Sequence, residues 1–218
     1  MRSMGRRHRA VKGKRPYDGT LRRERARRNQ NRVIKAAERR FLRDGYGPTT
    51  IAAIADDAGV SVDTIYKSFG GKPGLVRAIR EQALLGRGPI PAEQRSDELQ
   101  ARLPDPRKII EAWGTLTTEV GPRAAPILLL VRDAARTDPE LHSLLEEMDA
   151  DRLRRMTDNA RRLHATGGLR SGITIAHTAE ILWTYSSPEL FELLVLRRRM
   201  PLNRYGQFVS DSMISALL

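Results

Sequence analysis

Residues 51–70 place a small residue, a glycine and two apolar residues at a spacing that strongly restricts how this chain can fold. Two short helices that cross closely need a small side chain at the crossing, and Ala55 supplies it. The turn four residues later needs a residue that tolerates positive φ, which Gly59 provides. Val60 can then fill the gap between the helices, while Ile65 points back toward the same core. The spacing therefore predicts a helix-turn-helix.

The flanking residues supply matching start and stop signals. Thr49-Thr50 offers a hydroxyl cap for the first short helix, and Ser61 offers one for the second. A longer helix is expected before them, over residues 21–44, because apolar residues recur there every three or four positions. A fourth helix should begin at Lys72, since the proline that follows it suits the first turn of a helix.

Beyond residue 85 the pattern changes. Residues 86–106 contain glycines and prolines that interrupt every helical period, so we expect a boundary zone without a helix. Helical patterns then return between Gly-Pro, Asp-Pro, Gly-Gly and Ser-Pro breaks. The expected helices cover residues 107–120, 123–136, 139–165, 174–186, 188–199 and 202–218.

These elements predict an all-α fold with two parts. The N-terminal part is a three-helix helix-turn-helix domain, and the C-terminal part is a helical bundle. We expect residues 1–20 to form a basic flexible arm and residues 21–70 to form the helix-turn-helix domain. Residues 71–218 then form the second domain, with helix 72–85 connecting the two.

The positive charge is concentrated at the N-terminal end. The chain carries a net charge of +13, and most of it lies in residues 1–28, where cations greatly outnumber anions. Such asymmetry indicates a polyanionic partner at this end. The alternative is a solvated basic tail without a specific role.

Other signals are missing from the sequence. No apolar run reaches the roughly 18 residues that a membrane helix needs, and the basic start leads into no apolar segment typical of a secretory signal. The chain has no cysteine, so disulfides and cysteine zinc sites are excluded. We therefore expect a cytoplasmic protein with no membrane partner, no metal and no cofactor.

From Arg32 to Leu75 the sequence resembles the DNA-binding domain of the TetR family of bacterial transcription regulators. The resemblance rests on a dense set of motif residues in the family's order. They are Ala36, Ala37, Phe41, Gly45, Tyr46, Thr49, Thr50, Ile54, Ala55, Ala58, Gly59, Val60, Ser61, Thr64, Ile65, Tyr66, Phe69, Lys72 and Leu75.

The resemblance implies a DNA-binding role for residues at and after the turn. Ser61 belongs to this set as a residue of the turn itself. Side chains that match phosphate-holding positions are two hydroxyls, a phenol and a cation, all of them suitable donors. These are Thr50, Thr64, Tyr66 and Lys72, and the positions that face base edges are Val62, Asp63 and Lys67.

Each base-facing side chain has a chemically matched partner in the major groove. Lys67 can donate to guanine O6 or N7, Asp63 can accept from cytosine N4, and Val62 can pack on a thymine methyl. A carboxylate near phosphates is unfavourable without such a donor, so Asp63 either reads a base or is held by the helix N-terminus. We expect Phe69 to pack in the core, and Tyr66 to pack its ring while its hydroxyl reaches a phosphate.

The basic arm gains a use in this setting. Arginine-rich arms beside helix-turn-helix domains can lie in a neighbouring minor groove. We hypothesise that the arm adds such contacts through Arg6, Arg7, Arg9 and Arg15.

Residues 107–218 resemble the family's C-terminal domain only loosely. In the family the last two helices usually pair with their twins in a dimer, which here would involve parts of residues 174–199 and 202–218. The candidates, each equally consistent with an internal core, are Ile181, Leu182, Leu190, Leu194, Phe208, Val209 and Met213.

A ligand pocket is implied among the central helices. Its candidate residues are polar or aromatic side chains on otherwise apolar segments, for each of which ordinary packing is the alternative. They are Trp113, Thr117, Arg132, Met156, His177, Trp183 and Tyr185.

The resemblance thus implies a sequence-specific DNA-binding transcriptional regulator, and regulators of this family are usually ligand-responsive repressors. It would bind a palindromic operator on double-stranded DNA as a homodimer, since one short helix reads too few bases. An unknown small-molecule inducer would control it, and it would be nucleoid-associated when bound to DNA. A ligand-free regulator is a variant of this hypothesis.

Two other classes of protein were weighed against it. A non-specific architectural DNA-binding protein would rely on the basic arm and protect no palindrome. An enzyme would need a catalytic constellation, but the four histidines have no metal-binding spacing and no serine lies in a GxSxG motif. We therefore expect that the chain is not an enzyme.

Overall fold

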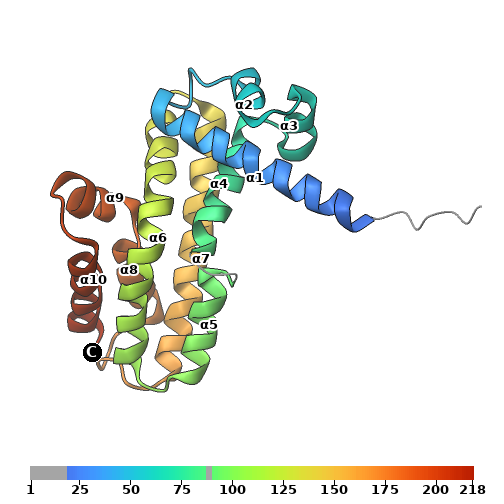
Figure 1. Cartoon of the computed structure of the whole chain (residues 1–218). Helices are drawn as coiled ribbons and strands as arrows, with labels where there is room; N and C mark the ends of the chain where they lie inside the picture. Colours follow the sequence, from blue (N-terminus) through green and yellow to red (C-terminus); the bar gives the residue numbers. More distant parts are fainter. Residues whose placement is uncertain (1–18, 87–89) are drawn as a thin grey trace, which may run out of the picture.

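The computed structural model describes residues 19–86 and 90–218, and all regular structure within them is helical, which confirms the all-α prediction (Figure 1). None of the described helices is both long enough and apolar enough to cross a membrane. The elements are α1 (Gly19–Asp44), α2 (Ile51–Ala58), α3 (Val62–Phe69), α4 (Lys72–Leu85), α5 (Ala92–Arg102), α6 (Pro106–Ala134), α7 (Pro139–Ala165), α8 (Ile175–Tyr185), α9 (Pro188–Phe191), a π-helix (Glu192–Arg197) and α10 (Leu202–Leu217).

The helix-turn-helix forms where the sequence predicts it. The Thr50 hydroxyl accepts a hydrogen bond from the backbone N–H of Ala53 at 3.1 Å and caps α2. The Ser61 hydroxyl caps α3 in the same way, at 3.2 Å from the N–H of Thr64. Gly59 closes α2 in the left-handed region, at φ 62° and ψ 44°, where a side chain would be strained.

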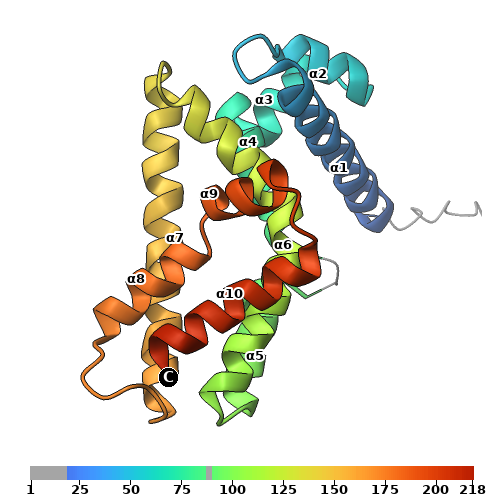
Figure 2. The ribbon, with the colours of Figure 1, turned by 90° about the vertical axis from the view of Figure 1, so that its left-hand side faces the viewer.

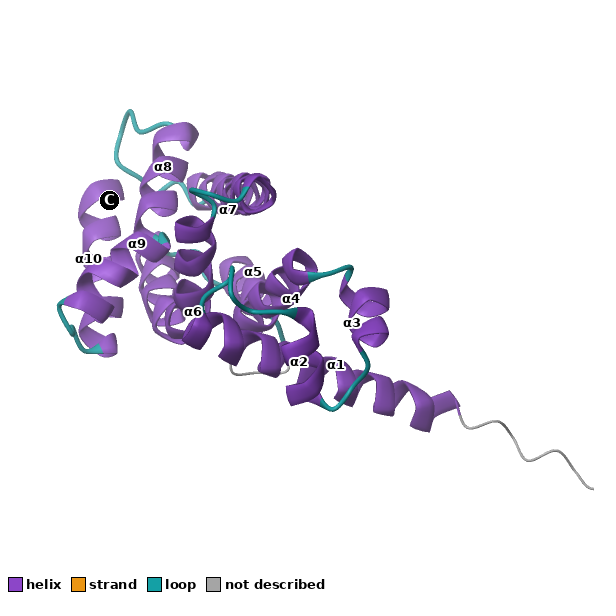
Figure 3. Cartoon of the chain, turned by 90° about the horizontal axis from the view of Figure 1, so that it is seen from above, coloured by secondary structure: helices purple, strands orange, loops and turns teal. Residues whose placement is uncertain are grey.

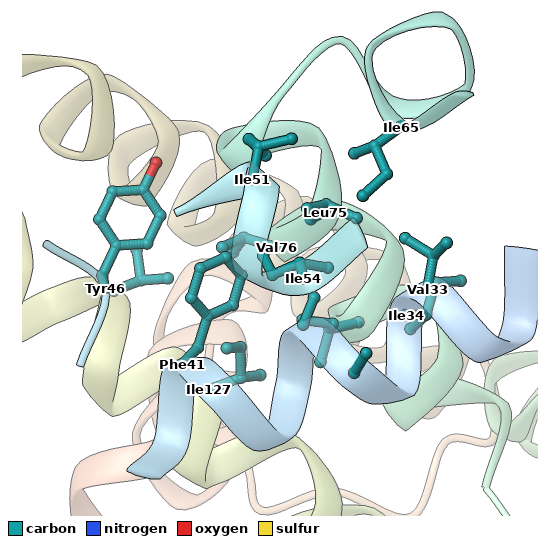
Figure 4. Packing of buried hydrophobic residues seen from close by; sticks show 14 of the residues in the cluster. Val33, Ile34, Phe41, Tyr46, Ile51, Ile54, Ile65, Leu75, Val76 and Ile127 are labelled. Carbon is teal, nitrogen blue, oxygen red and sulfur yellow. The ribbon is translucent and has the colours of Figure 1, made fainter. Parts of the chain in front are cut away.

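A compact apolar core holds α1, α2 and α3 together (Figure 4). Phe41 is fully buried at its centre, and its ring lies 5.3 Å from the ring of Tyr46. Ile54 and Ile65 are completely buried and bring α2 and α3 onto α1. Burial of each such side chain contributes about 1.5–3 kcal/mol to folding, so these three residues set the position of α3.

A salt bridge fixes α1 to α2 on the outside of this core. The Arg40 guanidinium donates two hydrogen bonds of 2.7 Å to the two carboxylate oxygens of Asp57. These hydrogen bonds lower the pKa of Asp57 below its ordinary value. The contribution of Asp57 to stability is therefore complete above the ordinary carboxyl pKa and is lost as the pH falls through the lowered one.

The same core extends into the long helices below it. It includes Leu75, Val76 and Ile79 of α4, and continues into α6 and α7 through residues such as Ile127 and Leu144. An ion pair between Arg77 of α4 and Glu147 of α7, at 2.6 Å, lies beside this contact. The apolar core therefore continues across the predicted domain boundary after residue 70.

The C-terminal helices form a second core in which α10 packs on α6 and α8 packs on α7 (Figure 2). Glycines let α6 and α10 approach closely. A Cβ atom added to Gly114 would lie 2.5 Å from the carbonyl oxygen of Gly206, and one added to Gly206 would lie 2.5 Å from Thr118. Two backbones therefore touch at this crossing, which only glycine permits.

The expectation of a helix-free zone at residues 86–106 is wrong, because α5 lies inside it. Residues 92–102 contain no proline or glycine, and Pro91 directly precedes the helix. Contacts with other helices hold α5 in place, including two hydrogen bonds from Arg95 to the Glu119 carboxylate at 3.0 and 2.7 Å. Tertiary contacts thus stabilise a short polar helix whose apolar pattern is too weak to reveal it.

The expected break at Gly121-Pro122 is also absent, because α6 continues through both this site and Pro126. Gly121 is placed where the Phe191 ring packs against the helix, since an added Cβ would lie 2.7 Å from that ring. The predicted helix over residues 188–199 is found as a short α-helix that widens into the π-helix.

Candidate nucleic-acid interface

Helix α3 turns almost all of its surface outward. Ile65 is its one buried residue, while Val62 is 39% exposed and Tyr66 is 53% exposed. Phe69 packs against the core as predicted. A short helix that is anchored at one position and exposed elsewhere can enter a groove without uncovering the core.

The three residues predicted to face base edges lie together on this outward surface. Lys67 and Asp63 form an ion pair at 2.6 Å, one helical turn apart, with side chains 76% and 70% exposed. The carboxylate of Asp63 therefore has Lys67 as its partner in the free protein. Exposed ion pairs of this kind contribute little to stability, so Asp63 and Lys67 can separate at small cost and each can bind a base instead.

Two of the predicted DNA-binding hydroxyls, those of Thr50 and Ser61, already serve as helix caps. Thr50 caps α2, and the hydroxyls of Ser61 and Thr64 lie 2.8 Å apart at the start of α3. The Thr50 hydroxyl keeps a hydrogen that it can donate to an anion, and so does one of the Ser61 and Thr64 pair, since the other donates within the pair. These side chains thus order the two helix starts.

Lys72 is placed differently from the other predicted contacts. Its Nζ donates to the carbonyl oxygens of Tyr46 at 2.6 Å and Gly47 at 3.3 Å, and lies 4.1 Å from the centre of the Tyr46 ring. Partial burial lowers the pKa of the Lys72 ammonium below its ordinary value. Lys72 therefore fastens the start of α4, directly after α3, to the turn between α1 and α2.

The predicted arm contacts cannot be placed on this surface. Arg6, Arg7, Arg9 and Arg15 lie outside the described residues. Six exposed arginines also lie in α1 before its first buried residue, and the sequence showed them only as part of the charge excess. They are Arg22, Arg23, Arg25, Arg27, Arg28 and Arg32.

Far from this surface, the C-terminal bundle encloses a cavity of about 690 Å³. Five of the seven predicted ligand-binding residues line it: Trp113, Thr117, Arg132, Met156 and Trp183. The other two predicted residues lie outside the lining. His177 is exposed near Glu180, and Tyr185 packs edge-on against Phe208 at 6.5 Å.

The cavity combines apolar walls with many charged and polar side chains, some of which are held in place by contacts with the protein. The Arg152 guanidinium lies 4.1 Å from the centre of the Trp183 ring and donates to the Trp183 carbonyl oxygen at 2.5 Å. Burial lowers the pKa of Arg152, although a guanidinium remains protonated at neutral pH. At the other wall, the Trp113 Nε1–H donates to the Ser96 hydroxyl at 2.9 Å. Sequence reasoning missed Arg152, since arginines are frequent throughout α7.

The predicted dimer residues divide into two groups. Leu182, Val209 and Met213 are buried in the chain's own core. Ile181, Leu190 and Leu194 are half-buried, and Phe208 is 40% exposed. Exposed apolar residues also occur nearby in the π-helix, at Leu193 and Leu196. Within the described residues, no group of three or more histidine, aspartate or glutamate side chains could hold a metal ion.

Comparison with known sequences supports the resemblance in the first half of the chain. Residues 33–79 match the family described as bacterial regulatory proteins of the tetR family. The chain is 38% identical over 66 residues to YvkB, an HTH-type transcriptional regulator of Bacillus subtilis. These residues make up 30% of this chain and 35% of YvkB. It is 43% identical over 56 residues to TtgR of Pseudomonas putida, covering 26% of this chain and 27% of TtgR. The matches thus span about a third of these relatives.

Comparison with solved structures extends the likeness in fold to most of the chain. The SmeT–triclosan complex is similar at a TM-score of 0.68 with 22% identity, over 87% of this chain and 91% of SmeT. NalD, the secondary repressor of the MexAB-OprM efflux pump in Pseudomonas aeruginosa, is similar at 0.66 with 22% identity, over 89% and 98%. FadR of Bacillus subtilis in complex with stearoyl-CoA gives 0.67 with 16% identity, over 85% and 97%.

Two lysines at the interface should respond differently to the same substitution. Lys72→Met removes hydrogen bonds to two backbone carbonyls, so we expect a loss of about 1–2 kcal/mol and a melting temperature lower by a few degrees. Lys67→Met removes an exposed ion pair and should change stability by under about 0.5 kcal/mol. Thermal unfolding measures both, and equal melting temperatures would contradict these assignments.

Proposed function

We propose that the chain is a regulator of the TetR family that binds a palindromic operator as a homodimer and represses transcription until a small molecule releases it. DNA-binding transcriptional regulation is the activity of that family, which consists of regulators rather than enzymes. The operator, the dimer, the repression and the effector are the parts proposed here.

The observation that carries the proposal is the outward surface of α3. Three side chains with different base preferences lie exposed on one short helix, while Ile65 anchors its opposite side. We assign Val62, Asp63 and Lys67 to base edges in the major groove. Around them, the hydroxyls of Thr50, Ser61, Thr64 and Tyr66 and the ammonium of Lys72 serve as donors to phosphate oxygens.

Binding would separate the ion pair of the free protein. Asp63 and Lys67 each satisfy the other in solution, so neither leaves an unpaired charge before DNA arrives. On the right sequence, Lys67 gains guanine acceptors and Asp63 gains a cytosine amino group. On a wrong sequence both charges lose contact with water in the groove without gaining a base partner, and this cost adds discrimination to binding.

Selection of bound sequences from random duplex DNA should recover a palindrome whose half-sites lie about one helical turn apart or slightly more. Lys67→Gln should relax the preference at one position in each half-site, with a cost of about 1–3 kcal/mol at the preferred base. Lys35→Gln is the matched control, because Lys35 is an exposed lysine of α1 outside α3.

Two outcomes would contradict the assignment. If Lys35→Gln and Lys67→Gln relax the sequence preference equally, net charge rather than position matters. If no palindrome is enriched and binding is strong only at low salt, the architectural alternative replaces the regulator.

We assign the dimer contact to the side of the molecule formed by α8, the π-helix and α10. Leu193, Leu196 and Phe208 expose large apolar side chains there, and such side chains gather at interfaces between subunits. Leu182, Val209 and Met213 support these helices from beneath, since they are buried in the core. Symmetry then presents two α3 helices to successive turns of a palindrome.

Phe208→Arg should convert the dimer to a monomer, because it places a charge within the proposed apolar contact. Sedimentation analysis should show half the mass, and operator affinity should fall at least tenfold. Leu85→Arg makes the same change at another exposed apolar residue, on α4, and should leave the mass unchanged. An unchanged mass for Phe208→Arg would place the dimer contact elsewhere.

We infer that the cavity binds an apolar effector with a polar end. SmeT binds triclosan and FadR binds stearoyl-CoA in the structures that this fold matches, so bundles of this shape can hold such molecules. Here apolar walls such as Leu116 and Leu128 surround the fixed guanidinium of Arg152. Arg80 of α4 also lines the cavity and forms an ion pair with Asp151 at 3.4 Å. A ligand that displaces Arg80 would thus move the helix that carries Lys72.

The two tryptophans of the chain both line the cavity, so intrinsic fluorescence reports on its occupant. Titration with triclosan and with long-chain acyl compounds should change this fluorescence, raise the melting temperature and weaken operator binding. Ala124→Phe fills part of the cavity and should suppress all three effects. If none of these compounds alters operator binding, the hypothesis of a regulator without a ligand is favoured.

A further inference from the structure

The first half of α1 extends beyond the body of the protein (Figure 1). Its buried residues begin only at Val33, and residues 22–32 are exposed except for Asn29, which is half-buried. Asn31 contacts Gln82 of α4 through a side-chain hydrogen bond of 3.0 Å. None of residues 22–32 is buried in the core of the described part of the chain.

Such a helix is unfavourable on its own. Six arginines lie between residues 22 and 32 against the single carboxylate of Glu24, whose bond to Arg28 is exposed and 3.4 Å long. Like charges three or four residues apart destabilise a helix, and isolated helices of this length are marginal in water. A polyanion beside the helix would remove that repulsion.

The arginines are not spread evenly around the helix. Arg25, Arg28 and Arg32 share one side with Asn29, where together they line a shallow hollow. Asn29 holds the Arg32 guanidinium at 2.9 Å. Arg23 and Arg27 do not line this hollow, and within the described part of the chain neither has an acidic partner.

This side of α1 leads directly to the helix-turn-helix. A Cβ atom added to Gly59, the residue of the turn between α2 and α3, would lie 3.8 Å from a guanidinium nitrogen of Arg32. The row of three arginines, Arg25, Arg28 and Arg32, therefore starts beside the turn between α2 and α3. It extends from residue 25 to residue 32, a rise of about 10 Å along the helix axis, which corresponds to about three nucleotide steps of one DNA strand.

The direction of the helix decides which DNA it meets. Seen from above, α1 runs away from the side formed by α8 and α10, and its first residues lie beyond α3 (Figure 3). If two copies join through α8 and α10, the arginine row points outward from the palindrome rather than toward its centre.

We propose that Arg25, Arg28 and Arg32 bind the DNA backbone outside the palindrome, so that each subunit contacts flanking duplex as well as its half-site. The proposal rests on the proposed function, since it needs an operator to flank. Phosphates are contacted without regard to sequence, so the row adds affinity and salt dependence but no base preference.

The test compares two double variants of the full chain with the same loss of charge. Arg25→Gln/Arg28→Gln removes two members of the row, whereas Arg23→Gln/Arg27→Gln removes two arginines outside it. Binding to a selected palindrome is measured against salt concentration, on a duplex with long flanks and on one trimmed to the palindrome. Circular dichroism checks that both variants are folded.

With long flanks, Arg25→Gln/Arg28→Gln should reduce the slope of log affinity against log salt by about 1.8 and lower affinity roughly thirtyfold at 0.15 M salt. On the trimmed duplex this variant should bind like the wild-type chain. Arg23→Gln/Arg27→Gln should lose less affinity than Arg25→Gln/Arg28→Gln on the long-flanked duplex, and its loss should not depend on the flanks.

Equal losses for the two variants, or equal losses on both duplexes, would overturn the proposal. Either result leaves the recovered palindrome intact, so it is distinguishable from a failure of the proposed function. Failure to select any palindrome would refute that function first and this inference with it.

Discussion

The packing of α3 depends on an apolar core that the helix-turn-helix does not close by itself. Ile65 of α3 enters a cluster that also contains Leu75, Val76 and Ile79 of α4. The same cluster continues into α6 and α7 through Ile127 and Leu144. Because protein cores are densely packed, a shift of α4 cannot leave α3 where it was. The exposed surface of α3 and the C-terminal bundle are therefore joined through one continuous apolar core.

Helix α4 occupies the central position in this arrangement. At its start, Lys72 binds the turn after α1, and near its middle Arg77 and Arg80 pair with carboxylates of α7. Its Arg80 side chain also reaches the cavity. Helix α4 thus connects residues that line the cavity to the core that it shares with α3.

The sequence predicted the parts of this fold in which local signals and packing agree. Thr50, Gly59 and Ser61 each satisfy a local backbone requirement, and the same residues mark the helix ends in the structure.

Prediction from the sequence failed where tertiary contacts override local preference. Helix α5 has almost no apolar face and is held by Arg95 and by the Trp113–Ser96 hydrogen bond. Helix α6 continues through two prolines because neighbouring helices pack along its length. The arginine row on α1 was visible only as a charge excess, since its direction depends on how α1 packs.

If α3 reads DNA in two symmetric copies, its position on the duplex can be measured directly, because the chain has no cysteine and accepts a single introduced one. A single Ser68→Cys substitution, at an exposed position of α3, provides one attachment point for an iron chelate that cleaves nearby DNA. On the selected operator, we predict two narrow clusters of cleavage in the major groove, about one helical turn apart or slightly more. Cleavage spread evenly along the duplex, or a single cluster, would contradict the account.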